Sequence, residues 1–427
     1  MKIKKILQLG SAFVLSLSAL LTMSMPLAHA ATLTCTWTDA SGSDNNFSTA
    51  GNWTNCGGGA PDSVGGDVYN LIFPASASGF GPIVDISGLT VGSISFTGGG
   101  YDLSSSGPST EGMTVSGGIT DTSSGPNNEI DLNITVSGSQ SFMAGATSQL
   151  VLGDGSNTLT VGGNTLTLAN ALVTGPIVGS GSIVVNDAHY PADVDGVDLQ
   201  AASPSFTGSV SVNQGALFVD ASGALSAASQ VTVASGALLK GNGGVSAATV
   251  QSGGTVAPGH SPGCITASTA TISGTYLAQI GGTTACSTYD QLQVSGSVNV
   301  TNGTLQLALI NGFSPTVGQS FEIINNTGSN PVTGTFSGLP EGATFSSGGH
   351  TFQISYKGGT GNDVTLTVVN PASAQAATSS GSSTSVPKAP DTGFRAVAAH
   401  SAIILAFSTL IAFTLLVIAR RLKPARP

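Results

Sequence analysis

The densest group of chemically capable side chains lies in residues 186–198. Asp193, Asp195 and Asp198 alternate with other residues on both sides of a glycine. Carboxylate oxygens at this spacing suit Ca²⁺, so the segment is a candidate calcium site; apart from this Ca²⁺ we expect no cofactor. No glutamate closes the loop at EF-hand distance, so the other interpretation is a solvated insertion. Residues 358–363 spell one GGxGxD unit, and we interpret this single copy as a turn.

A candidate nucleophile motif follows at residues 259–263, which read Gly-His-Ser-Pro-Gly and match G-x-S-x-G. That motif works on a strand-to-helix turn, whereas here prolines surround the serine and no helical pattern follows. Lyases of acidic polysaccharides need a cationic residue, and the chain before Gly393 contains no arginine. No Asp-Asp pair offers the two carboxylates of a hydrolase. We therefore expect no catalytic residues and no enzymatic activity.

The four cysteines are Cys35, Cys56, Cys264 and Cys286. Four cysteines allow three pairings, and our first hypothesis is the local one, which joins the first to the second and the third to the fourth. Each bond would close a loop of about twenty residues and stabilise the fold by about 3 kcal/mol. The spacing that a zinc site requires is absent.

Charge is distributed unevenly along the chain. All 21 acidic residues lie between Asp39 and Asp391, where the only bases are Lys240, Lys357 and Lys388, so this span carries 3 − 21 = −18. Such a surface cannot neutralise phosphates, which excludes nucleic acid as a partner, and it is repelled by an anionic membrane.

The N-terminal segment, residues 1–30, is typical of a secretory signal peptide. Lysines precede an apolar run, Ile6–Leu21, and small residues at Ala28 and Ala30 form the cleavage site. The sequence therefore predicts export of the protein.

The C-terminus is typical of a membrane anchor. A linker rich in Ser, Thr and Ala occupies residues 371–388, and an apolar segment covers residues 396–419. A helix of this length would be about 36 Å long and could span a bilayer as a transmembrane helix. Because basic residues follow it, the positive-inside rule predicts that the N-terminal body lies outside the cell.

The motif before this helix consists of Ala389, Pro390, Asp391, Thr392 and Gly393. The order of motif, helix and basic tail over residues 389–427 resembles the LPxTG sorting signal of Gram-positive sortase substrates. The resemblance implies that a sortase cleaves after Thr392 and joins its carbonyl to peptidoglycan. Ala389 departs from the usual leucine. An uncleaved single-pass anchor is the alternative, and we favour cell-wall attachment.

Short β-prone segments separated by Gly, Ser and Asn recur through residues 88–284. Leu159 and Leu166 begin two of them seven positions apart, as do Val210 and Leu217. Three such segments make about twenty residues, the length of one coil of a parallel β-helix. The sequence therefore predicts an all-β solenoid of about nine or ten coils, and a β-sandwich is the rival fold.

Residues 252–263 read SGGTVAPGHSPG and resemble a turn of autotransporter passenger repeats, and residues 289–292 and 358–364 fit the C-terminal passenger segment of that family. The resemblance implies a right-handed parallel β-helix used for surface display, adhesion or shielding, with residues 285–370 as its C-terminal β segment. The chain departs from that family after Pro371, where we expect a linker and one helix in place of an outer-membrane barrel.

An open end of such a stack exposes a strand edge, so we expect residues 31–87 to form a disulfide-containing N-terminal cap. Trp37 and Trp53, the only tryptophans, lie in its predicted disulfide loop. A sugar-stacking site is the alternative role for these two indoles.

Together these features predict a secreted, surface-anchored, structural or adhesin-like β-rod without catalytic activity. Its expected partners are a sortase, peptidoglycan, the membrane through the C-terminal helix, and a ligand or glycan on a host or neighbouring cell. The alternative is a carbohydrate-binding or glycan-processing β-helix protein.

Overall fold

The computed structural model describes residues 31–370 except 65, 78–79, 108–111, 190–195 and 221–224. The predicted signal peptide with Ala28 and Ala30, the linker, the motif Ala389–Gly393 and the apolar segment 396–419 lie outside the described residues. Within the described residues, no helix is both long and apolar enough to cross a membrane.

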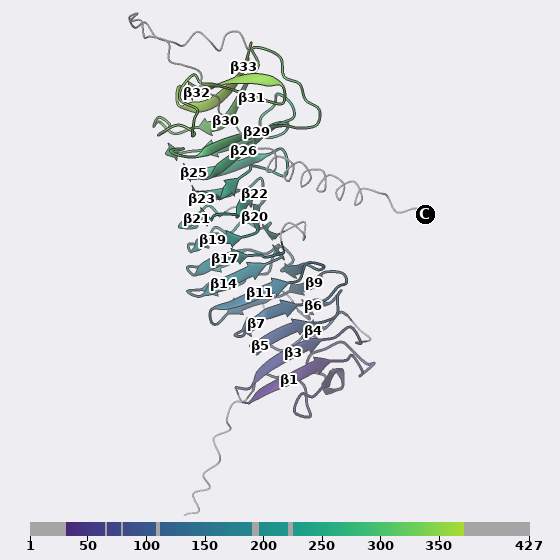
Figure 1. Ribbon diagram of the computed structural model, residues 1–427. Helices are drawn as coiled ribbons and strands as arrows, with labels where there is room; N and C mark the ends of the chain where they lie inside the picture. The colour runs from purple at the N-terminus through teal and green to yellow at the C-terminus, as the bar shows by residue number, and fades with distance from the viewer. Residues whose placement is uncertain are drawn as a thin grey trace, which may run out of the picture.

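The described chain is all-β and is built from two long sheets stacked in one elongated body (Figure 1). The smaller sheet, which we call sheet B, has eleven strands in chain order, and each pairs in parallel with the next. Its strands are β4 (Ile83–Val84), β6 (Asp102–Ser105), β9 (Asn128–Asp131), β12 (Leu150–Leu152), β15 (Ala171–Val173), β18 (Val197–Leu199), β20 (Ala216–Val219), β22 (Leu238–Lys240), β24 (Thr255–Val256), β26 (Thr275–Ile280) and β29 (Thr304–Leu309).

The larger sheet, sheet A, has 22 strands and is parallel through most of its length. Its N-terminal half contains β1 (Thr32–Trp37), β3 (Val68–Phe73), β5 (Leu89–Phe96), β7 (Gly112–Val115), β8 (Ile119–Asp121), β10 (Asn133–Val136), β11 (Gln140–Ala144), β13 (Leu159–Gly162), β14 (Thr165–Ala169), β16 (Ile177–Gly179) and β17 (Ser182–Asn186). Its C-terminal half contains β19 (Ser209–Gln214), β21 (Gln230–Val233), β23 (Gly244–Val250), β25 (Cys264–Ile272), β27 (Gln291–Val294), β28 (Val298–Asn299) and β30 (Ser320–Asn326).

Register partners in both sheets lie about one predicted repeat apart in the chain. In sheet A, Val210 pairs with Val231, and Val231 pairs in turn with Ala248 on the following repeat. In sheet B, Leu217 pairs with Leu239 in the same way. The sequence prediction of an all-β chain with parallel strands is therefore confirmed.

The core lies between the sheets because alternate side chains of each strand point inward. One inward row of sheet A consists of Ile183, Val210, Val231, Ala248 and Ala270, which pair in register and are each at most 3% exposed. Burial of each larger aliphatic side chain contributes about 1.5–3 kcal/mol. Every strand thus shares its apolar row with the repeats before and after it.

Antiparallel strands close both ends of sheet A. At the start, β2 (Trp53–Thr54) pairs with β1. At the other end, β31 (Thr344–Ser347), β32 (His350–Gly358) and β33 (Asp363–Val369) form antiparallel pairs, and β33 joins them to β30. Parallel pairing already begins between β1 and β3, inside the segment expected to be a cap.

Candidate functional site

The predicted calcium ligands are not assembled by the described residues. Asp193 and Asp195 lie outside them, whereas Asp198 lies on β18, where its Oδ2 accepts a hydrogen bond of 2.8 Å from Gln200 Nε2. A calcium site at these three carboxylates therefore stays a prediction.

Both disulfides follow the local pairing, Cys35 with Cys56 and Cys264 with Cys286, which confirms that hypothesis. Disulfides persist in oxidising surroundings, so these two bonds are consistent with a secreted protein. The first bond joins β1 to the segment that follows β2, and the second joins β25 to the segment that follows β26.

Trp37 and Trp53 are part of the core at the N-terminal end of the body. They are 0% and 5% exposed, and their ring centroids lie 5.1 Å apart in an edge-to-face arrangement. The Trp53 indole N–H donates to the Phe47 carbonyl oxygen at 2.9 Å. Neither indole presents a ring face to solvent, so these residues do not form the sugar-stacking site considered as an alternative.

The Gly-His-Ser-Pro-Gly segment is a turn between β24 and β25, as the sequence analysis interpreted it, and is not a strand-to-helix elbow. His260 stacks on Phe218 with ring centroids 5.4 Å apart, and its Nε2 lies 2.5 Å from Asp220 Oδ1. Residues 359–362 connect β32 and β33, and Asp363 Oδ2 accepts a hydrogen bond of 2.7 Å from the Thr360 N–H. That carboxylate therefore stabilises the turn between the two strands.

The structure brings together one carboxylate cluster that the sequence analysis missed. Asp102, Glu129 and Asp131 each offer a carboxylate oxygen, and these oxygens all lie within 4.8 Å of one another. Asp102 is on β6, whereas the other two are on β9 and point to the same outward side because they are two positions apart. Parallel register places Asp102 directly opposite Glu129. Only this register, between strands of two successive repeats, reveals the cluster.

Asp131 is the chemically most perturbed member of the cluster. Partial burial, and then the negative charges of Asp102, Glu129 and Asp154, raise the pKa of Asp131 to about 6. A carboxyl group with such a pKa holds its proton closer to neutral pH than an ordinary aspartate does.

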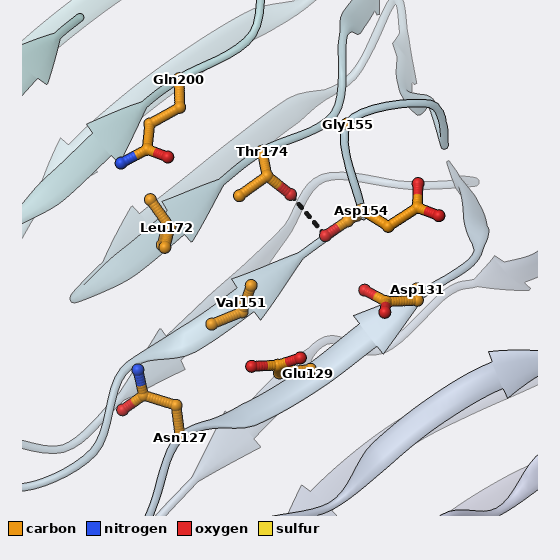
Figure 2. Close-up of a pocket in the computed structure, with 10 residues that line it drawn as sticks. Asn127, Glu129, Asp131, Val151, Asp154, Gly155, Leu172, Thr174 and Gln200 are labelled. Atoms are coloured by element: carbon orange, nitrogen blue, oxygen red, sulfur yellow. Dashed lines mark hydrogen bonds between the residues drawn. The ribbon is translucent and has the colours of Figure 1, made fainter.

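The cluster borders a shallow hollow of about 600 Å³ on the outward side of sheet B (Figure 2). Val151 and Leu172 contribute apolar surface, and Thr174 and Gln200 contribute polar groups. None of the described residues that line it is aromatic or basic. The carboxylates could bind a divalent cation through hard oxygen ligands, or act as an acid and base pair.

No known family model matches the chain, and no curated protein matches it. The resemblances to sortase substrates and to autotransporter passengers therefore rest on the motifs quoted above.

Proposed function

We propose that the chain is a secreted, surface-anchored rod, a right-handed parallel β-helix that serves as a structural or adhesive protein and does not catalyse a reaction. The observation that carries this proposal is the unbroken parallel pairing of sheet B from β4 to β29. Its eleven strands, about 4.8 Å apart, extend for roughly 48 Å along the body.

Closure of both ends supports a rod of defined length. An uncovered strand edge is a template for pairing with another chain. Here β2 covers part of β1, and the antiparallel strands β31–β33 follow the last parallel repeats. A body that ends in this way projects a fixed distance from its attachment point and leaves its sides available for contacts.

Attachment to peptidoglycan by a sortase is the proposed form of anchoring, with Ala389–Gly393 as the recognised motif. In the source cell, the wild-type chain should resist detergent extraction and end at Thr392, whereas Thr392→Ala should be extracted with the membrane. Equal resistance of the two proteins, together with a retained C-terminal helix, would overturn sorting and support the single-pass anchor.

A glycan-processing role is the second candidate, and the carboxylate cluster favours it. Retaining glycosidases hold two carboxyl groups about 5 Å apart, one of which has a raised pKa and donates a proton. In that role Asp131 would be the acid and Glu129 the nucleophile. The hollow is shallow and offers no aromatic platform among its described lining residues, which is why we place this role second.

A turnover assay distinguishes the two candidates. The purified full chain is incubated with a panel of neutral and acidic polysaccharides, next to Asp131→Asn as the matched variant. We expect no released product from either protein. Product release by the wild type that Asp131→Asn abolishes would replace the non-catalytic proposal with the enzymatic one.

A further inference from the structure

The outward side of sheet A carries a regular array of hydroxyl groups, which we call the hydroxyl face. It consists of two outward positions on each of β14, β17, β19, β21, β23 and β25, stacked in one file in Figure 1. Its twelve residues are Thr165, Thr167, Ser182, Val184, Ser209, Ser211, Gln230, Thr232, Ala247, Thr249, Thr269 and Thr271. Nine of the twelve are Ser or Thr, none is charged and none is aromatic, and all are exposed or half-buried.

Strand register arranges these side chains in two straight rows. One row of register partners consists of Thr167, Val184, Ser211, Thr232, Thr249 and Thr271. Neighbours within a row are about 4.8 Å apart, and the two rows are about 6.6 Å apart because two residues of rise separate them. The face is therefore a two-dimensional lattice about 24 Å long.

The lattice is held in place by the core beneath it and by hydrogen bonds among its own side chains. The residue between the two outward positions of each strand belongs to the buried core; Ile183 and Val231, for example, are 0% exposed. Hydrogen bonds also link side chains of the face: the Ser182 and Ser209 hydroxyls lie 3.0 Å apart within one row, and Gln230 Nε2 donates to Thr249 Oγ1 of the other row at 2.9 Å. Close packing beneath the sheet leaves the outward side chains little freedom to change their spacing.

These properties restrict the chemistry of a partner. The face offers a charged ligand no ion pair, because none of its twelve residues is charged, and the net charge of −18 between Asp39 and Asp391 repels an acidic ligand. A face without aromatic rings offers no platform for sugar stacking. Many weak hydroxyl contacts in fixed register add up only when the partner is itself rigid, uncharged and periodic in two directions.

We propose that the hydroxyl face binds the surface of crystalline ice. The oxygen atoms of hexagonal ice repeat in two directions at spacings close to those of the rows, and threonine and serine hydroxyls donate to and accept from water. Ice would be the surface to which the proposed adhesive rod attaches, so this inference rests on the proposed function.

The test measures partition of the purified full chain into slowly growing ice. The wild type should be enriched in the ice fraction relative to an inert protein of similar size. Thr232→Lys/Thr249→Lys, which places two charges on the face, should reduce the enrichment about tenfold or more. The matched control, Thr304→Lys, places a charge at an exposed position of β29 in sheet B and should behave as the wild type.

Melting temperature and disulfide content establish that each variant is folded. If the lysine variant does not fold, Thr232→Val keeps the strand propensity and should still lower the enrichment. No enrichment of the wild type would overturn the proposal, as would an equal loss in Thr304→Lys. Binding to crystalline cellulose or chitin without binding to ice would overturn it as well, in favour of a polysaccharide partner.

This experiment is independent of anchoring. It uses purified protein, so failure of cell-wall sorting leaves the ice measurement unchanged. Conversely, a chain that does not partition into ice would still be a surface rod if the Thr392→Ala experiment supports sorting.

Discussion

The outward sides of the two sheets share one core but differ in chemistry. The hydroxyl face of sheet A is uncharged over six strands, whereas one outward row of sheet B mixes charge with apolar groups. That row consists of Asp102, Glu129, Val151, Leu172, Asp198, Phe218 and Lys240. Inward residues are therefore constrained by packing alike in both sheets, and the outward residues determine what each side can bind.

Stacking in register amplifies whichever residue type occupies the outward positions. In sheet A it aligns hydroxyl groups into rows, and in sheet B it places Asp102 beside Glu129, so that like charges help to raise the pKa of Asp131. A uniform row produces a repeating surface, whereas a mixed row produces a local cluster.

The largest effect should come from placing a charge inside rather than outside on one strand. Leu168→Lys introduces an unpaired cation at a fully buried position of β14 and should lower the free energy of unfolding by more than ~4 kcal/mol. Thr167→Lys, one position earlier and on the hydroxyl face, should change it by about 0.5 kcal/mol or less. Urea denaturation measures both, and similar losses would contradict the assigned inward and outward sides.

Loss of the Cys264–Cys286 disulfide should have the next largest effect. The bond joins cysteines with a sequence separation of 22, in a loop that leaves sheet A at β25 and passes through β26 of sheet B. Replacing both cysteines by serine should lower the free energy of unfolding by about 3 kcal/mol. Each single-cysteine variant loses the same bond and should show a similar loss in the same urea titration, and an unchanged midpoint would show that the bond does not stabilise this loop.

Asp290 is a buried polar link between the two sheets. Its Oδ1 accepts from the Gly263 N–H beside β25 and its Oδ2 accepts from the Gln279 N–H of β26, both at 2.9 Å. Asp290→Ala removes the acceptor of both N–H groups and should lower the free energy of unfolding by about 2 kcal/mol. Asp290→Asn keeps one acceptor oxygen and should lower the free energy of unfolding by less. If calorimetry shows equal losses for Asp290→Ala and Asp290→Asn, the hydrogen bonds contribute nothing.

Asp131→Asn should slightly stabilise the protein, in contrast to the substitutions above. Because the pKa of Asp131 is raised from 3.8 to about 6 in the folded state, ionisation of this residue destabilises the fold progressively as the pH rises from about 4 to 6, and the loss is complete above pH 6. As the pH falls from 7 toward 4, the folded state takes up the proton first and the stability from this residue rises. Solvent screening limits the gain from Asp131→Asn at pH 7 to about 1 kcal/mol.

The control for this prediction is the comparison of the wild type with Asp131→Asn at pH 4. Residue 131 is then uncharged in both folded proteins, so their free energies of unfolding should be nearly equal. Chemical denaturation at the two pH values measures the difference. A stabilisation by Asp131→Asn that is equal at pH 7 and pH 4 would show that repulsion among the carboxylates is not its cause.

Most of the fold could be predicted from local sequence patterns. The alternation around Val210–Val212 and Val231–Val233 predicted strands at those positions, and the local pairing, our first hypothesis among the three that four cysteines allow, matches both disulfides. The carboxylate cluster and the hydroxyl face could not be derived in this way. Repeats differ in length: the sequence separation between the register partners Val231 and Ala248 is much smaller than that between Ala270 and Val298. Outward neighbours therefore follow only from the register.

The most direct test therefore measures the register of neighbouring strands in sheet A. In a Thr232→Cys/Thr249→Cys variant, the two thiols lie opposite each other on adjacent strands, and mild oxidation should join them readily. In Thr232→Cys/Thr271→Cys, an intervening strand separates the positions by about 9.6 Å, so the same oxidation should leave the thiols free. A crosslink that forms preferentially in the second variant, or in neither, would contradict the parallel stack on which both surfaces depend.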